Sequence, residues 1–112
     1  LISGSIGEEL ASSFLGFKAV VKELPDIEKI LNGEEKSVPT DTSALHILCT
    51  ALAIRVTNDT RTKELENILN YSLNLPGEFA VMIIQDLRQR DISLDYLKSW
   101  SLWMKKFNTL LH

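Results

Sequence analysis

The chain has 112 residues, of which 45% are hydrophobic and 24% are charged. This composition is ordinary for one globular domain that buries a core without disulfides or a structural metal. The net charge of −3 at pH 7 argues against a nucleic-acid-binding module, which normally presents a basic face. The chain begins with Leu1 rather than methionine, so we expect residues 1–112 to be a single domain taken from a longer protein.

The cysteine content and the lack of a targeting segment indicate the compartment. Cys49 is the only cysteine of the chain, so no internal disulfide can form. The sequence has no signal peptide, and no apolar run approaches the roughly 20 residues that span a bilayer. These features favour a cytoplasmic protein without a membrane partner.

The first predicted helix covers residues 5–24. Ser5, followed three residues later by Glu8, fits a capping box at its start. Pro25 disfavours helical geometry at the residue before it and so ends the helix. One apolar ridge runs along it, at spacings of three and four residues: Ile6, Leu10, Phe14, Phe17, Val21 and Leu24.

A short second helix is predicted between Pro25 and Gly33. Asp26 and Glu28 lie in its first turn, and Gly33 suits the left-handed position that ends a helix. Its inward-facing residues are predicted to be Ile27, Ile30 and Leu31. The polar, irregular stretch Gly33–Thr42 then predicts a surface loop.

A third helix is predicted from about Asp41, which has threonine on both sides as alternative N-caps, to about Thr57. Its polar residues form only a narrow stripe through His46, Thr50 and Thr57, so we expect a deeply buried helix. The apolar residues around the rest of it are Leu45, Ile47, Leu48, Ala51, Leu52, Ile54 and Val56.

A turn at Thr57–Thr60 leads to a fourth, amphipathic helix from about Arg61 to Leu73. The stretch Leu75–Arg90 is predicted to be the central helix. Pro76 suits its first helical position, because the missing N–H of proline would be unpaired there in any case. Its first half, Phe79–Ile84 with Met82 included, is apolar on every side, which is typical of a helix in the middle of a bundle.

The last helix is predicted to follow directly after Asp91-Ile92-Ser93. A seam close to heptad spacing runs along it: Leu97, Trp100, Met104, Phe107 and Leu111. This seam places Trp100 in the core and leaves Trp103 outside it, as a candidate contact for a partner protein. Together the elements predict an all-α bundle of about six helices, with Leu45–Val56 and Phe79–Leu87 at its centre.

No catalytic set and no metal-ligand spacing is visible in the sequence. His46 and Cys49 lie three residues apart on the third helix, and a polar residue beside a buried thiol is the ordinary interpretation of that pair. Arg55 either reaches a neighbouring protein or acidic partner, or extends along its own helix into solvent. The predicted burial of His46 follows from the apolar residues on both sides of it.

The start of the first helix carries small residues. Backbone N–H groups at Gly4, Ser5 and Gly7 either face an anion or serve ordinary helix capping. No Gly-rich phosphate-binding loop of the form GxxxxGK[ST] is present.

Four segments follow one another along the chain: Gly4-Ser5-Ile6-Gly7-Glu8-Glu9 with Phe14-x-x-Phe17, Leu24-Pro25-Asp26-Ile27, Val38-Pro39, and Leu75-Pro76-Gly77-Glu78-Phe79. Together with the later Asp86-Leu87-Arg88, they resemble the C-terminal helical region, the lid and post-lid helices, of MoxR-like AAA+ ATPases. The resemblance covers nearly the whole chain.

The resemblance implies a lid region without catalytic groups of its own, joined to an α/β core that holds ATP and Mg²⁺. In such ATPases, neighbouring subunits form rings, commonly hexamers, that couple hydrolysis to the remodelling of client proteins. It also implies that the helix start at Gly4, Ser5 and Gly7 lies nearest the nucleotide. Lids of this family often supply a sensor arginine there, whereas the first arginine of this chain is Arg55.

A free-standing helical module that binds another protein through its exposed faces is the alternative interpretation. An ATPase core would carry a phosphate loop roughly two hundred residues before Leu1, whereas a native start near Leu1 would favour the module.

Overall fold

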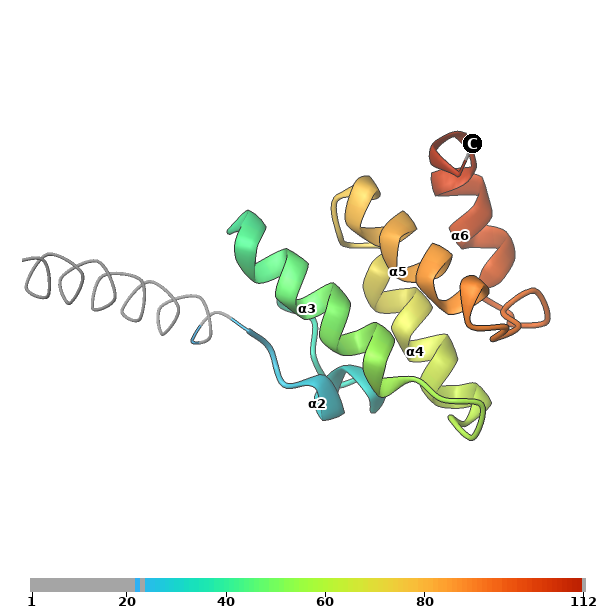
Figure 1. Ribbon diagram of the computed structural model, residues 1–112, viewed down its shortest axis with the longest axis horizontal. Helices are drawn as coiled ribbons and strands as arrows, with labels where there is room; N and C mark the ends of the chain where they lie inside the picture. Colours follow the sequence, from blue (N-terminus) through green and yellow to red (C-terminus); the bar gives the residue numbers. More distant parts are fainter. Residues whose placement is uncertain (1–21, 23, 112) are drawn as a thin grey trace, which may run out of the picture.

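The computed structural model describes residue 22 and residues 24–111, so most of the predicted first helix lies outside the described residues. The described part of the chain is all-α and contains five α-helices and a short 3-10 helix, without a strand (Figure 1). These are α2 (Ile27–Leu31), α3 (Thr42–Arg55), α4 (Thr62–Ser72), α5 (Gly77–Gln89), α6 (Trp100–Phe107) and η1 (Asn108–Leu110). The five α-helices correspond to five of the six predicted ones, which confirms the predicted all-α bundle.

The helix α5 lies at the centre of the described bundle. It packs against α3 on one side and against α6 and η1 on the other, while α4 packs against α2 and α6 (Figure 1). Its buried side chains join one hydrophobic core that includes residues from every described α-helix: Phe79, Ala80, Val81, Ile83, Ile84 and Leu87. The central position predicted for this segment is confirmed.

Two details of α5 differ from the sequence prediction. Pro76 is the N-cap residue with an extended backbone, and Gly77, rather than Pro76, is the first helical residue. Met82 is only partly buried, because it lies at the rim of a surface hollow between α3 and α5. The first half of α5 is therefore not packed against apolar neighbours on every side.

Local capping signals act close to where the sequence predicts them, except that Asp26 is the N-cap of α2 and not a residue of its first turn. The Asp26 carboxylate accepts a hydrogen bond from the Glu28 N–H at 2.9 Å and caps α2. The Asp41 carboxylate accepts one from the Ala44 N–H at 3.1 Å and caps α3. Gly33 has a φ of 77°, the left-handed conformation expected of the residue that ends α2.

The prediction that the third helix is deeply buried was wrong for one of its faces. Ile54 is 70% exposed, Ile47 and Ala51 are only partly buried, and His46 is exposed rather than buried. The helix also ends at Arg55, two residues before the predicted end. Because α3 is apolar nearly all round, its periodicity could not indicate which face the bundle leaves open.

The last helix begins later than predicted, at Trp100 rather than after Ser93. Residues 91–99 form turns instead, and Asp91 has a positive φ of 60° at the end of α5. Since Leu97 lies in these turns, it cannot belong to one helical seam with the residues after it.

This shift exchanges the predicted positions of the two tryptophans. Trp103 is fully buried and Trp100 is only partly buried, the reverse of the heptad prediction. On the shorter helix, Trp103 and Phe107 at i and i+4 form the inward-facing side, with their ring centroids 5.0 Å apart. Trp103 is therefore a core residue and not a surface contact for a partner.

Candidate functional site

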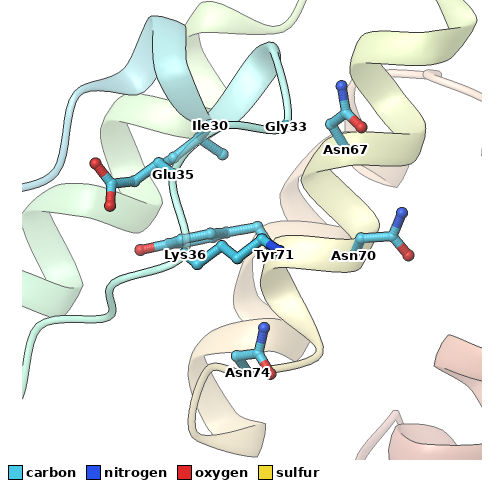
Figure 2. A pocket seen from close by; sticks show the side chains of 8 residues that line it. All are labelled: Ile30, Gly33, Glu35, Lys36, Asn67, Asn70, Tyr71 and Asn74. Carbon is cyan, nitrogen blue, oxygen red and sulfur yellow. The ribbon is translucent and has the colours of Figure 1, made fainter.

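A polar groove lies between α4 and the segment that follows α2. Its volume is about 350 Å³. Figure 2 shows the side chains that line it: Ile30, Gly33, Glu35, Lys36, Asn67, Asn70, Tyr71 and Asn74. Its three asparagines lie on α4 or directly after it at i, i+3 and i+7, so amide groups follow one side of that helix.

Two side chains of this groove already hold the end of α2 and the loop after it against α4. The Asn67 amide donates to the Leu31 carbonyl at 2.7 Å, and the Tyr71 hydroxyl donates to the Ser37 carbonyl at 2.7 Å. Burial raises the pKa of Tyr71 above its ordinary value, and Glu35 adds to the effect, so the hydroxyl keeps the proton that it donates. These two groups therefore have a structural task within the groove.

An apolar surface on α3 is the second candidate. Five residues, named here the α3 face, line a shallow hollow of about 360 Å³: His46, Ile47, Thr50, Ala51 and Ile54. A second hollow of about 280 Å³ shares Thr50 and Ile54 and extends to Met82 and Asp86 on α5. The open apolar surface thus begins on α3 and continues onto the edge of the central helix.

His46 and Cys49 do not form a reactive pair. The His46 ring lies edge-on to Phe79, with the centroids 5.0 Å apart and an interplanar angle of 82°. The Cys49 thiol is buried and donates to the Phe79 carbonyl at 3.8 Å. Burial raises the pKa of Cys49 to about 12, so the thiol is uncharged at neutral pH and acts as a small core residue.

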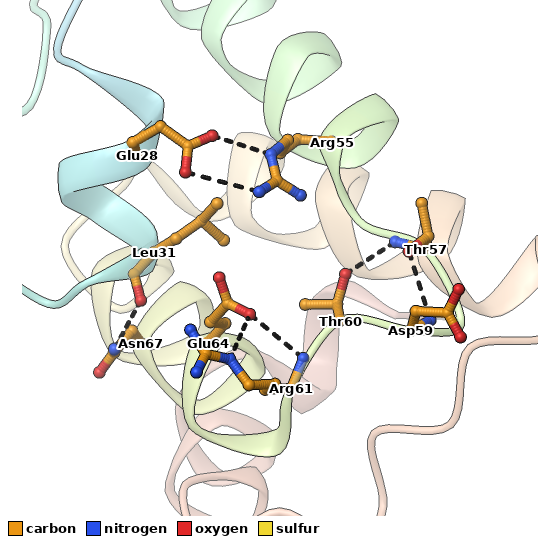
Figure 3. Close-up of polar contacts among 9 residues, drawn as sticks. All are labelled: Glu28, Leu31, Arg55, Thr57, Asp59, Thr60, Arg61, Glu64 and Asn67. Carbon is orange, nitrogen blue, oxygen red and sulfur yellow. Dashed lines mark hydrogen bonds and ion pairs between the residues drawn. The ribbon is translucent and has the colours of Figure 1, made fainter.

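A polar cluster joins the ends of α2, α3 and α4 (Figure 3). The Arg55 guanidinium contacts the Glu28 carboxylate at 2.8 Å and 3.5 Å. This hydrogen-bonded contact raises the pKa of Arg55 above its ordinary value. Arg55, predicted to contact a partner or solvent, is half-exposed and is paired with a carboxylate of its own chain.

The beginning of α4 belongs to the same cluster. The Glu64 carboxylate accepts from the Arg61 N–H at 3.2 Å and from the Arg61 guanidinium at 3.3 Å. The hydrogen bond from the Arg61 backbone, with the weaker side-chain contact, lowers the pKa of Glu64. The preceding turn is closed by a hydrogen bond from the Thr60 N–H to the Thr57 carbonyl at 3.1 Å. The cluster in Figure 3 fixes how these three helices end and begin.

Among the polar contacts over long sequence distances that were not predicted, three fix the ends or the packing of helices, and the first involves Arg90. Its guanidinium donates to the Ala53 carbonyl and, at 2.6 Å, to the Val56 carbonyl, at the end of α3. Arg90 also contacts the Asp86 carboxylate of α5, four residues earlier, at the longer distance of 3.9 Å. Only this i, i+4 pair has a local sequence signal, because the carbonyls belong to another helix.

The second contact links α4 to the start of α6. The Glu66 carboxylate accepts hydrogen bonds from the Lys98 N–H and, at 3.0 Å, from the Ser99 N–H. Desolvation acts to raise the pKa of Glu66, but the hydrogen bonds from Ser99 and Lys98 outweigh it, and the pKa lies below its ordinary value. A carboxylate here also suits the positive end of the helix dipole.

The third contact is buried. The Trp103 indole N–H donates to the Ser72 hydroxyl at 2.9 Å, and that hydroxyl donates to the Leu69 carbonyl at 2.7 Å. Both side chains are fully buried. A serine on an inward helix face and a tryptophan are the only sequence signals for this pair, and neither names its partner.

The remaining predicted site residues, Gly4, Ser5 and Gly7, lie outside the described residues. Within the described ranges, no group of three or more His, Cys, Asp or Glu side chains is arranged to hold a metal ion. In the same part of the chain, none of the helices has the length and apolarity required to cross a membrane.

Comparisons with known protein families, with curated proteins and with solved structures found no match.

Proposed function

We propose that this chain is the C-terminal helical region of a MoxR-like AAA+ ATPase. The observation that supports it is where the resembling segments lie in the fold. Leu24-Pro25-Asp26 leads into α2, Val38-Pro39 leads into α3, and Leu75-Pro76-Gly77 opens the central helix α5. Each segment therefore lies just before a helix or at its start. There, proline and the residue before it restrict the backbone and so set the direction of the helix.

In this role the chain contains no catalytic residue. ATP and Mg²⁺ bind in a separate α/β core, with the helix start at Gly4, Ser5 and Gly7 nearest the nucleotide. The described helices share one hydrophobic core, so they would move together as a rigid lever when the core binds or hydrolyses ATP. Their outer faces then contact neighbouring subunits of a ring, which acts on a protein client in the cytoplasm.

The mass of the native protein tests this proposal directly. An antibody against residues 24–111 would be used to probe a lysate of the source cells. We expect a band about three times as heavy as this 12.6 kDa chain, because a core of roughly two hundred residues would be attached. The purified parent protein should hydrolyse ATP and should lose its ring assembly when this region is deleted. A band at 12.6 kDa would exclude the proposal.

A protein-interaction module without an attached ATPase is the second candidate. It is favoured by the α3 face, where Ile54 is 70% exposed beside other apolar side chains. The same blot separates the two candidates, because the module requires the band at the mass of this chain alone.

A further inference from the structure

The α3 face is apolar and is left open by the described residues. Ile47, Thr50, Ala51 and Ile54 lie at i, i+3, i+4 and i+7, the spacing at which one helix presents a seam to another. Two of these four residues are small or short, so a partner helix can approach closely. An isoleucine that is 70% exposed is otherwise an unfavourable residue at this position.

We propose that the N-terminal segment Ile6–Val21 of the same chain packs on the α3 face and covers it. Its apolar residues recur at the same spacings of three and four: Ile6, Leu10, Phe14, Phe17 and Val21. On a helical projection, Glu8, Ser12 and Lys22 fall on the opposite side and would remain in water. The proposal does not depend on the proposed function of the chain.

The position of the segment's end supports this occupant. Leu24 continues the same ridge, and it is already packed against the hydrophobic core. A few residues later, Glu28 is bound to Arg55 at the end of α3, so the chain enters the bundle beside that helix. The occupant is thus joined covalently to the surface that it covers, which raises its effective concentration there.

The segment Ile6–Val21 and the helix α3 also have similar lengths. A helix over Ile6–Val21 would be about 24 Å long at 1.5 Å per residue, and the 14 residues of α3 span about 21 Å. The segment is long enough to cover the α3 face from Ile47 to Ile54, while Met82, in the neighbouring hollow on α5, stays in contact with water. A second copy of the chain would have to provide the same ridge without the covalent link.

Limited proteolysis of the 112-residue chain by trypsin tests the proposal. Lys18 lies in the segment and Lys22 directly follows it, and cleavage there yields products that begin at Ala19 or Glu23 and are identified by mass. We expect Ile54→Asp to raise the cleavage rate at these two sites at least about tenfold, because cleavage follows the population of the detached segment.

The matched control is Leu102→Asp. Leu102 is 56% exposed on α6 and does not belong to the α3 face, so the same change there should leave cleavage at Lys18 and Lys22 unaltered. The double variant Phe14→Asp/Phe17→Asp alters the segment instead of the face and should give the same increase. Adding Ile54→Asp to that variant should then increase the rate no further.

Three results would overturn the proposal. One is an equal cleavage rate in the wild-type and the Ile54→Asp chain. Another is additive effects of the segment and face variants. The third is a wild-type dimer in light scattering that Ile54→Asp dissociates, since that would assign the α3 face to a second copy. If Ile54→Asp failed to fold, the Phe14→Asp/Phe17→Asp rate against wild type would decide alone.

Discussion

Among the single residues, Trp103 brings a polar N–H group into the core. Its indole donates to the Ser72 hydroxyl at 2.9 Å, and both side chains are fully buried. A buried donor without a partner costs more than the hydrogen bond contributes when it is formed. The pair therefore fixes how α6 is positioned against α4, in addition to the area that the indole buries.

Ser72→Ala should lower the free energy of unfolding by about 1–3 kcal/mol, because it leaves the Trp103 N–H buried without an acceptor. In a Trp103→Phe background, the same serine change should cost much less, since no indole N–H remains. Urea denaturation of the four proteins in this double-mutant cycle measures the coupling. A coupling energy near zero would show that the hydrogen bond contributes nothing to stability.

Arg90 acts at the end of another helix. Its guanidinium donates to two carbonyls of the last turn of α3 and its C-cap, groups that a helix leaves without partners. Arg90→Met should lower the free energy of unfolding by about 1–2 kcal/mol. Arg90→Lys should restore only part of it, because an ammonium lacks the planar fork that serves both carbonyls.

Lys63→Met is the control for Arg90→Met, because Lys63 is an exposed basic residue on α4. It should change the free energy of unfolding by less than about 0.5 kcal/mol. Similar losses in the two variants would mean that the charge of the chain, and not the contact with α3, determines the effect.

At the scale of elements, the start of α6 depends on a carboxylate from α4. The residues just before Trp100 offer no side-chain cap, and the Glu66 carboxylate accepts from the backbone at Lys98 and Ser99 instead. Removing that charge should loosen the beginning of α6 while α4 itself remains folded, because Glu66 is not needed for the contacts within α4.

The lowered pKa of Glu66 makes this contact dependent on pH. A carboxyl group whose pKa is lower in the folded state stabilises the fold above its unfolded pKa, and the contribution is lost as the pH falls through the folded pKa. Wild type should therefore lose stability more steeply than Glu66→Gln below about pH 4.3. Thermal melts between about pH 7 and pH 3 would measure the difference.

Glu34→Gln serves as the control for the pH series, because Glu34 is an exposed carboxylate in the loop after α2. Glu35 and Glu64 also have lowered pKa values, and they remain in every one of these proteins. Only the difference between variants therefore reports on Glu66. Parallel curves for wild type and Glu66→Gln would contradict the assigned cap.

At the scale of the whole molecule, the sequence predicts those features whose cause is local. Asp26 and Asp41 cap helices through the next two or three residues, and Gly33 ends α2 through its own backbone. The central helix was also predictable, because a long apolar segment has few places in a bundle other than the middle.

The remaining features depend on residues far apart in the chain. Glu66 binds the backbone just before the start of α6, at Lys98, 32 residues later in the chain, and the late start of this helix exchanges Trp100 and Trp103 between surface and core. The candidate surfaces also depend on residues far apart in the chain, since the polar groove needs a loop and a helix brought together. The open side of α3 was unpredictable because apolar residues surround nearly the whole helix.

The central position of α5 leads to a prediction for the whole molecule. Ile84 is fully buried, and Ile84→Asp would place an unpaired carboxylate in the core at a cost of several kcal/mol. That cost is comparable to the total stability of about 5–15 kcal/mol of a domain, so cooperative unfolding should disappear. Gln85→Asp, at the next and exposed position, should unfold like wild type.

Met82→Asp tests whether burial of the replaced side chain, and not its position in the apolar segment Phe79–Ile84, determines the loss of stability. Met82 is only partly buried beside the hollow between α3 and α5, so its new carboxylate can reach water and the protein should still unfold cooperatively. Urea denaturation followed by circular dichroism would rank the three variants. If Met82→Asp were as damaging as Ile84→Asp, the α3–α5 hollow would be closed to water at Met82 in the folded chain, contrary to this prediction.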